Sequence, residues 1–253
     1  MKKTLFLLVA VAMLFVSCKK DDPTPTSKVY LTQIYDISLN PVTGDTTMTN
    51  IQDYVWENGL LKRYLISIYY NSVNMSMGGY EYYYSGTNCI KAHYLSENSW
   101  KPDRFFTYEN GRLTSAFEVS DGDTLIKVTV HSYTEDGHIK SMTLYEVLPD
   151  RTSDFEFTWE NGDLKTLHLH EVGTEILDET YTYSYDNSPN VYTGMPLTEA
   201  VFSPFNKMYR YASKHNPVKE GEDLKYLNGR LVSVKCNKYI TYYTYSDGTT
   251  GKE

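Results

Sequence analysis

The dipeptide Asn-Gly recurs along the chain between runs in which apolar and polar residues alternate. It stands at Asn58-Gly59, Asn110-Gly111, Asn161-Gly162 and Asn228-Gly229, and the first three lie in the similar stretches YVWENGLLKR, FTYENGRLTS and FTWENGDLKT. A two-residue type I′ turn needs positive φ at both central residues, which Asn and Gly tolerate, so this pattern is a strong local signal for a β-hairpin. The sequence therefore predicts a chain built from antiparallel hairpins.

The glycines of these turns are spaced at near-constant intervals. Gly59, Gly86, Gly111, Gly137 and Gly162 follow one another in steps of 27, 25, 26 and 25 residues. A fixed period in this range is typical of a serial architecture. The stretch HSYTEDGHIKS around Gly137 has one more residue before its glycine, which predicts a three-residue loop with a glycine bulge. Asp186-Asn187 falls where the next turn of the series is expected.

Short connections are also predicted at the opposite ends of the strands, at Asp121-Gly122, Pro149-Asp150 and Gly173-Thr174. Each strand then pairs with the next one, which makes an antiparallel meander rather than a Greek key. About a dozen or more strands of usual length fit into the chain, and a sheet of that size must curve strongly or close into a barrel. The predicted fold class is therefore all-β, with residues 28–253 as a single domain.

The side chains near a turn predict which face of the sheet is buried. With strict alternation about Asn110-Gly111, Phe106 lies opposite Ser115, and one face carries Phe106, Tyr108, Leu113 and Phe117. The same alternation groups two further sets, Phe155, Phe157, Trp159 and Leu164, and Leu224, Tyr226, Leu231 and Ser233. The aromatic face is the predicted core, and the 25 tyrosines suit a half-covered sheet because each buries a ring and keeps a hydroxyl in water.

Residues 187–217 interrupt the hairpin pattern with four prolines. A short helix is predicted to begin at Pro196, since proline is favoured in the first turn. A connection of this length is usually functional or a cover. We favour a plug over one end of the sheet, filled by the apolar side chains of Val191, Tyr192, Phe202 and Phe205, over a lid that closes on a ligand.

The N-terminus has the pattern of an export signal. Lys2 and Lys3 precede an apolar run from Leu5 to Val16, which is too short to span a bilayer stably. The residues Ser17-Cys18 at the end of this run resemble the lipobox of bacterial lipoproteins. That resemblance implies a signal peptide at residues 1–17 and lipidation of Cys18, and the alternative is an ordinary signal peptide with an incidental cysteine. Residues 18–27 then form a lipidated cysteine with a flexible tether.

The charge of the mature chain excludes one class of partner. Removing Lys2 and Lys3 from the 24 basic residues leaves 22 against 32 acidic residues, a formal charge of −10. Such an acidic protein lacks the basic surface that nucleic acid needs. The two remaining cysteines, Cys89 and Cys236, stand in no spacing motif; free thiols are the favoured interpretation, and a disulfide between them stays open.

Several stretches resemble an uncharacterised Bacteroidetes lipoprotein family, a domain of unknown function described as porin-like in fold. The resemblance lies in the Cys18 lipobox, the Asn-Gly hairpins, YTYSYDNSPNVYTGM (181–195), SKHNPV (213–218) and the final NGRLVSVKC. The hairpins are also similar to YD-type repeats. Together with Lys19, the residue after the lipidated cysteine, the resemblance implies a lipid-anchored protein of the outer membrane, exposed at the cell surface. It implies no activity.

No residue set in the sequence predicts a reaction. His168 and His170 share one face of a strand but lack further metal ligands, and motifs for a nucleophilic serine, a phosphate loop or a dinucleotide are absent. We therefore predict no metal or cofactor, leave the catalytic residues and the oligomeric state unassigned, and favour a non-enzymatic binding or scaffold module that contacts glycans. Trp100 is the candidate binding aromatic. The alternative is a hydrolase of envelope or dietary polysaccharide that uses paired carboxylates.

Overall fold

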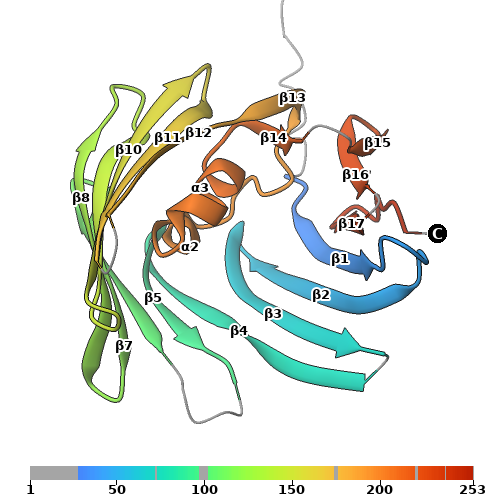
Figure 1. Ribbon diagram of the computed structural model, residues 1–253, viewed down its shortest axis with the longest axis horizontal. Coiled ribbons are helices and arrows are strands. Elements are labelled where there is room, and N and C mark those ends of the chain that lie inside the picture. The colour runs from blue at the N-terminus through green and yellow to red at the C-terminus, as the bar shows by residue number, and fades with distance from the viewer. Residues whose placement is uncertain are drawn as a thin grey trace, which may run out of the picture.

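The computed structural model describes residues 28–71, 73–96, 102–173, 176–219, 222–236 and 238–252. In this part of the chain a 15-stranded antiparallel sheet curls around two short helices, and two further strands pair beside them (Figure 1). The predicted all-β meander is confirmed. The sheet is strongly curved but open, so of the two predicted forms it adopts the curved sheet and not the closed barrel.

The large sheet contains β1 (Leu31–Leu39), β2 (Thr46–Glu57), β3 (Leu60–Tyr70), β4 (Val73–Ser85), β5 (Asn88–Tyr94), β6 (Asp103–Glu109), β7 (Arg112–Ser120), β8 (Asp123–Tyr133), β9 (Ile139–Glu146), β10 (Arg151–Glu160), β11 (Asp163–Val172), β12 (Ile176–Thr182), β15 (Asp223–Leu227), β16 (Arg230–Lys235) and β17 (Tyr239–Tyr245). The small sheet pairs β13 (Ser184–Pro189) with β14 (His215–Val218), and the helices are α2 (Thr198–Val201) and α3 (Pro204–Tyr211).

The first and last strands of the meander pair with each other. β1 lies antiparallel to β17, so the order of the sheet runs from β12 down to β1 and continues through β17 and β16 to β15. The sheet is therefore open between β12 and β15, where the chain leaves it to form β13, the helices and β14. We call residues 190–214, between β13 and β14, the plug.

The predicted Asn-Gly turns are confirmed, with positive φ at each residue of all four pairs: 51° and 79° at Asn58-Gly59, for example. Gly137 closes a three-residue loop between Thr134 and His138, as predicted, with φ 89°. The turn expected at Asp186-Asn187 is wrong, because these residues belong to β13. The chain after β11 divides at Tyr183 into β12 and β13, which join different sheets.

A β-bulge follows each Asn-Gly turn and changes the predicted register. In the β6–β7 hairpin Tyr108 pairs with Leu113, but Thr107 already pairs with Ser115, so Thr114 is an extra residue. Phe106 therefore lies opposite Ala116, and the prediction that it faces Ser115 is wrong. An extra residue reverses the faces of every residue beyond it. Phe117 consequently lies on the outer face, while Ala116 and Glu118 are buried on the inner one.

The buried face is otherwise the aromatic and aliphatic one that was predicted. Phe155, Phe157 and Leu164 are buried together, with Trp159 packed against the same core. The third predicted set divides: Leu231 and Ser233 of β16 are buried, whereas Tyr226 of β15 is exposed. β15 is the edge of the sheet, and a bulge between Lys225 and Tyr226 again shifts the pairing.

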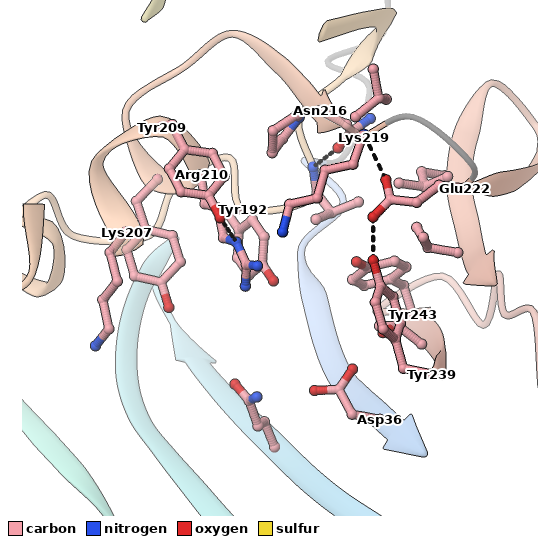
Figure 2. A pocket seen from close by; sticks show the side chains of 18 of the residues that line it. Asp36, Tyr192, Lys207, Tyr209, Arg210, Asn216, Lys219, Glu222, Tyr239 and Tyr243 are labelled. Atoms are coloured by element: carbon pink, nitrogen blue, oxygen red, sulfur yellow. Dashed lines mark hydrogen bonds between the residues drawn. The ribbon is translucent and has the colours of Figure 1, made fainter. Parts of the chain in front are cut away.

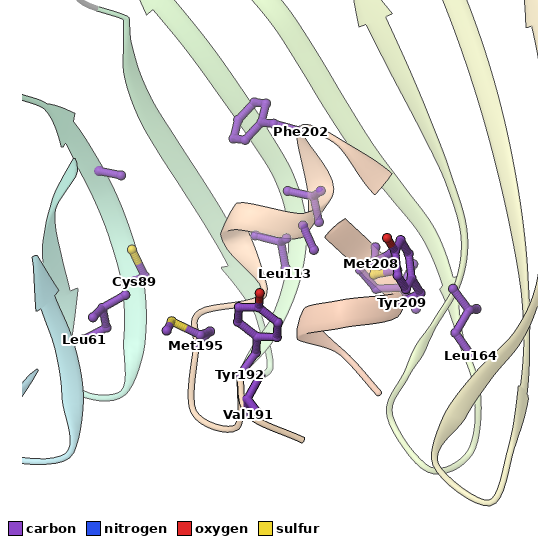
Figure 3. Close-up of a cluster of buried hydrophobic side chains, with 14 of the residues drawn as sticks. Leu61, Cys89, Leu113, Leu164, Val191, Tyr192, Met195, Phe202, Met208 and Tyr209 are labelled. Atoms are coloured by element: carbon purple, nitrogen blue, oxygen red, sulfur yellow. The ribbon is translucent and has the colours of Figure 1, made fainter. Parts of the chain in front are cut away.

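The plug lies on the concave side of the sheet and forms the centre of the core (Figure 3). Its apolar side chains meet residues from several strands, including Leu61, Leu113 and Leu164. The predicted filling by Val191, Tyr192 and Phe202 is confirmed, while the side chain of Phe205 lies outside the described part. The predicted short helix begins at Thr198, two residues after Pro196, and a second helix, α3, begins at Pro204.

Two buried asparagines hold the ends of the plug. The Asn190 side-chain amide donates to the carbonyl oxygens of Arg210 (2.6 Å) and Ser213 (2.8 Å), and its Oδ1 accepts from the backbone N–H of Tyr192. Asn216 Oδ1 accepts from the backbone N–H of Val191 at 2.8 Å. The side-chain hydrogen bonds of Asn190 and Asn216 thus link the two ends of the plug to each other.

Cys89 is a buried free thiol in β5, and Cys236, just after β16, is a partly exposed one. Neither helix among the described residues has the length and apolar character that crossing a membrane would require.

Candidate functional site

The inner face of the sheet changes from apolar to polar along β1, β2 and β17. In β1 the inward positions carry Ile34, then Asp36 and Ser38; in β2 they carry Asn50 and Gln52 beside the buried Tyr54. Polar groups turned towards the inside of a sheet are costly in a packed core, because they lose water without gaining partners. Their position indicates a solvated interior at this end of the strands.

A cavity of about 960 Å³ occupies that interior, between the inner face of β1–β3 and β16–β17 on one side and α3 on the other. This volume is at the upper end of the range of about 300–1,000 Å³ that is usual for ligand pockets. Figure 2 shows charged and aromatic side chains converging on it from the sheet, from α3 and from the segment after β14. The labelled lining residues are Asp36, Tyr192, Lys207, Tyr209, Arg210, Asn216, Lys219, Glu222, Tyr239 and Tyr243.

Arg210 projects from α3 into the cavity (Figure 2). Its Nε donates to the Tyr209 hydroxyl at 3.0 Å. Partial loss of water acts to lower the pKa of Arg210, but the neighbouring tyrosines raise it, so the guanidinium of this exposed residue stays charged. A guanidinium carries five N–H donors, so the single bond to Tyr209 leaves most of this capacity for a ligand.

Asp36 faces the cavity from β1 and is the acidic group opposite Arg210 (Figure 2). Burial raises the pKa of this carboxyl, and a hydrogen bond from Thr241 and the charge of Arg210 offset the effect only in part. Burial disfavours the carboxylate because it is separated from water. Asp36 therefore places a carboxyl group at the floor of the cavity.

Glu222, the second acidic group of the cavity, already has partners. It accepts hydrogen bonds from the hydroxyl of Tyr239 and from the backbone N–H of Lys219, the latter at 2.9 Å. These bonds engage the carboxylate as an acceptor and tie the segment after β14 to β17.

Tyrosines form much of the wall. Tyr183 and Tyr209 are stacked with centroids 4.7 Å apart, and Tyr192 and Tyr211 are tilted at 4.9 Å. Burial raises the pKa of the Tyr192 hydroxyl and, more strongly, of Tyr243. These phenols remain neutral at physiological pH, so each hydroxyl can donate as well as accept a hydrogen bond.

Two buried polar atoms of the lining residues have no partner within the described part of the protein: Asn50 Oδ1 and the Tyr183 hydroxyl. An unpaired buried polar group costs about 1–3 kcal/mol. A bound molecule that supplies a hydrogen bond to either atom would recover part of that cost.

A buried ion cluster fixes α2, and through it the plug, against the sheet. Arg104 of β6 lies 2.8 Å from Glu118 Oε2 and 3.3 Å from Glu199 Oε2, and its guanidinium covers the rings of Tyr80 and Phe202. Lys207 of α3 reaches the same Glu199 oxygen at 3.3 Å. Glu199 is in this position because α2 is fully buried, and Glu118 because the bulge at Thr114 in β7 turns it inward. The cluster is structural and orients the helix that carries Arg210.

The predicted site residues are not located relative to this cavity. Cys18 and Trp100 lie outside the described residues. His168 and His170 share one face, as predicted, and both reach Asp178 on the outside of the sheet, at 2.7 and 3.5 Å. Across the described residues, no three His, Cys, Asp or Glu side chains are grouped as a metal site would require.

Sequence reasoning missed the cavity because its signal is ambiguous. In the stretch LTQIYDISL, Tyr35 and Ile37 lie on one face of the strand and are at least as apolar as Ile34 and Asp36 on the other face. Alternation alone therefore does not tell which face points inward. In β11, by contrast, the sequence itself indicates the bulge. Leu164 and Leu167 are three positions apart, an odd number, so both can face inward only if a bulge lies between them.

Comparison with known proteins gives a likeness in fold. No protein-family model matches the chain, and no curated protein sequence matches it. Among solved structures, the crystal structure of a porin-like protein from Bacteroides uniformis aligns with a TM-score of 0.54 and 14% identity, over 85% of this chain and 96% of that one. A chain in the crystal structure of TcdB2-TccC3-Cdc42 aligns with a TM-score of 0.34 and 14% identity, over 79% of this chain and 12% of that one, which is too weak to carry an argument. The first likeness shows a shared fold.

Proposed function

We propose that the protein is a non-catalytic binding module whose site is the tyrosine-walled cavity, and that its ligand is a glycan. The observation that carries the proposal is the polar inward face of β1 and β2 within a cavity of about 960 Å³. Asp36, Asn50 and Gln52 are the side-chain types that bond sugar hydroxyls, and the surrounding rings offer flat apolar faces for a sugar ring.

The hydrolase alternative needs a general acid and a second carboxylate placed on either side of a glycosidic bond. The cavity contains two carboxyl groups, Asp36 and Glu222. Glu222 is engaged by Tyr239 and by the backbone of Lys219, which favours binding without turnover. The binding experiment below therefore also measures whether the glycan is hydrolysed.

The cellular address is part of the same proposal. The Ser17-Cys18 sequence supports lipidation of Cys18, an outer-membrane location and display at the cell surface, and the resemblance to the Bacteroidetes lipoprotein family supports the same address. Replacement Cys18→Ser is expected to release the protein from membranes into the soluble fraction. Retention of the Cys18→Ser protein in the membrane fraction would show that the anchor lies elsewhere.

Binding is tested with a soluble form, residues 19–253, which retains every described strand and helix. Calorimetry against a panel of polysaccharide-derived oligosaccharides and peptidoglycan fragments is expected to give saturable binding with no product on prolonged incubation. Ser38→Trp places a large ring in the cavity and is expected to abolish binding, whereas Ser85→Trp, at an exposed hairpin end, serves as the matched control. Absence of binding across the panel refutes the glycan proposal, and turnover supports the hydrolase.

A further inference from the structure

The cavity contains two cationic groups without a carboxylate partner. The guanidinium of Arg210 donates to the Tyr209 hydroxyl, and no ion pair joins it to an acidic side chain among the described residues. The ammonium of Lys219 projects towards the same space (Figure 2), and within the described chain it also forms no ion pair. Lys207, which lines the cavity too, differs from both because Glu199 neutralises it.

Arg210 and Lys219 are both exposed, so water still reaches each charge. Two cations that line one cavity and have no carboxylate partner among the described residues nonetheless make that part of its wall positively charged, which favours an anionic group on the ligand. Arginine suits a carboxylate in particular, since its fork of N–H donors matches the two oxygens, and the lysine adds a second charge.

The remaining lining groups restrict the rest of the ligand. Asp36, Asn50 and Gln52 lie on the sheet, across the cavity from α3, and offer acceptors and donors for hydroxyl groups. The stacked pair Tyr183 and Tyr209 and the tilted pair Tyr192 and Tyr211 line the space between. A molecule with a carboxylate at one end, hydroxyls at the other and a ring between them fits this distribution.

We propose that the cavity recognises a carboxylated sugar of the uronic-acid class, with the carboxylate held by Arg210 and Lys219 and the hydroxyls by the polar floor of β1 and β2. This inference rests on the proposed function, because it names the kind of glycan that the same cavity binds.

The test compares matched pairs of disaccharides: glucuronate, galacturonate and mannuronate disaccharides, and their methyl esters, which keep the shape and remove the charge. Calorimetry with residues 19–253 is expected to show at least one acid binding about tenfold or more tighter than its ester, the scale of a charge-assisted hydrogen bond. Arg210→Gln is expected to weaken binding of that acid about tenfold to a hundredfold and to leave the ester within about threefold.

Lys219→Gln is the second variant; Lys219 is exposed, so its replacement leaves the fold intact, and a smaller loss confined to the acid is expected. Arg63→Gln removes an arginine from the outer face of β3 and is the matched control, expected to bind like the wild type. Equal affinity for acids and esters, or equal losses of both with Arg210→Gln, overturns the assignment of a carboxylate but leaves the glycan site standing. Failure of every acid and ester to bind overturns this inference, and failure of the panel of oligosaccharides and peptidoglycan fragments as well overturns the proposed function.

Discussion

Replacement of Arg104 tests whether the buried ion cluster holds the plug. Arg104 is 12% exposed and lies between Glu118 at 6% and Glu199 at 4%, with contacts of 2.8 and 3.3 Å. Arg104→Met keeps the apolar stem but leaves Glu118 buried without its partner and Glu199 with Lys207 alone. Removing one member of a buried ion pair costs about 3–5 kcal/mol, so we expect a loss of about 4 kcal/mol.

The assay is equilibrium unfolding in urea at pH 7, followed by intrinsic fluorescence. With an m-value of about 3 kcal/mol/M, the expected loss lowers the midpoint by roughly 1.3 M. Arg151 supplies the control, because it also contacts two glutamates, Glu146 and Glu171, but is 38% exposed. Arg151→Met is expected to cost less than about 1 kcal/mol, as exposed pairs usually do.

Two results would refute the reasoning. One is an Arg104→Met protein within about 1 kcal/mol of wild type; the other is an equal loss for Arg104→Met and Arg151→Met. The double variant Arg104→Met/Glu118→Leu removes the stranded carboxylate, so it is expected to be more stable than Arg104→Met alone.

Two further predictions concern the same core and the turns. Burial acts to raise the pKa of Glu199, but Arg104 and Lys207 outweigh it and hold the pKa below the usual 4.5. A carboxyl group whose pKa is lower in the folded than in the unfolded state stabilises the fold above about pH 4.5, and this stabilisation is lost as the pH falls through the pKa of the folded state. Glu199→Gln is therefore expected to lower the free energy of unfolding by about 2 kcal/mol at pH 7 and by progressively less below pH 4.5. Urea unfolding of both proteins at each pH measures this difference, and a constant difference down to pH 3 would contradict the prediction. The other prediction compares two glycines. The added Cβ of Gly111→Ala meets open space at φ 77°, so this variant is expected to lose only about 1 kcal/mol of stability. The added Cβ of Gly79→Ala would lie 2.0 Å from the Tyr64 carbonyl oxygen, so this variant is expected to lose more than about 3 kcal/mol. Thermal unfolding compares the two variants, and equal melting temperatures would show that the strand approach at Gly79 is not rigid.

The sequence alone determined the local architecture of the protein. Positive φ at consecutive residues is a property of Asn and Gly themselves, so the turn at Asn110-Gly111 and its repeats were predictable without any partner. The all-β class and the succession of neighbouring strands followed directly, since a short turn leaves a strand no choice of partner but the next one. For the same reason the interruption at residues 187–217 was visible as a segment of different character.

Only the tertiary structure decided the phase of the strands, the edges of the sheet and the site. A single bulged residue, Thr114, moves Phe117 outward and Glu118 inward, and nothing in the local alternation requires it. The pairing of β1 with β17 joins residues more than 200 positions apart, so it depends on the accumulated curl of all the strands between them. The cavity exists because that curl encloses more space than the plug fills, and whether Asp36 lines it or faces solvent is settled by packing across the sheet and not by the residues beside it.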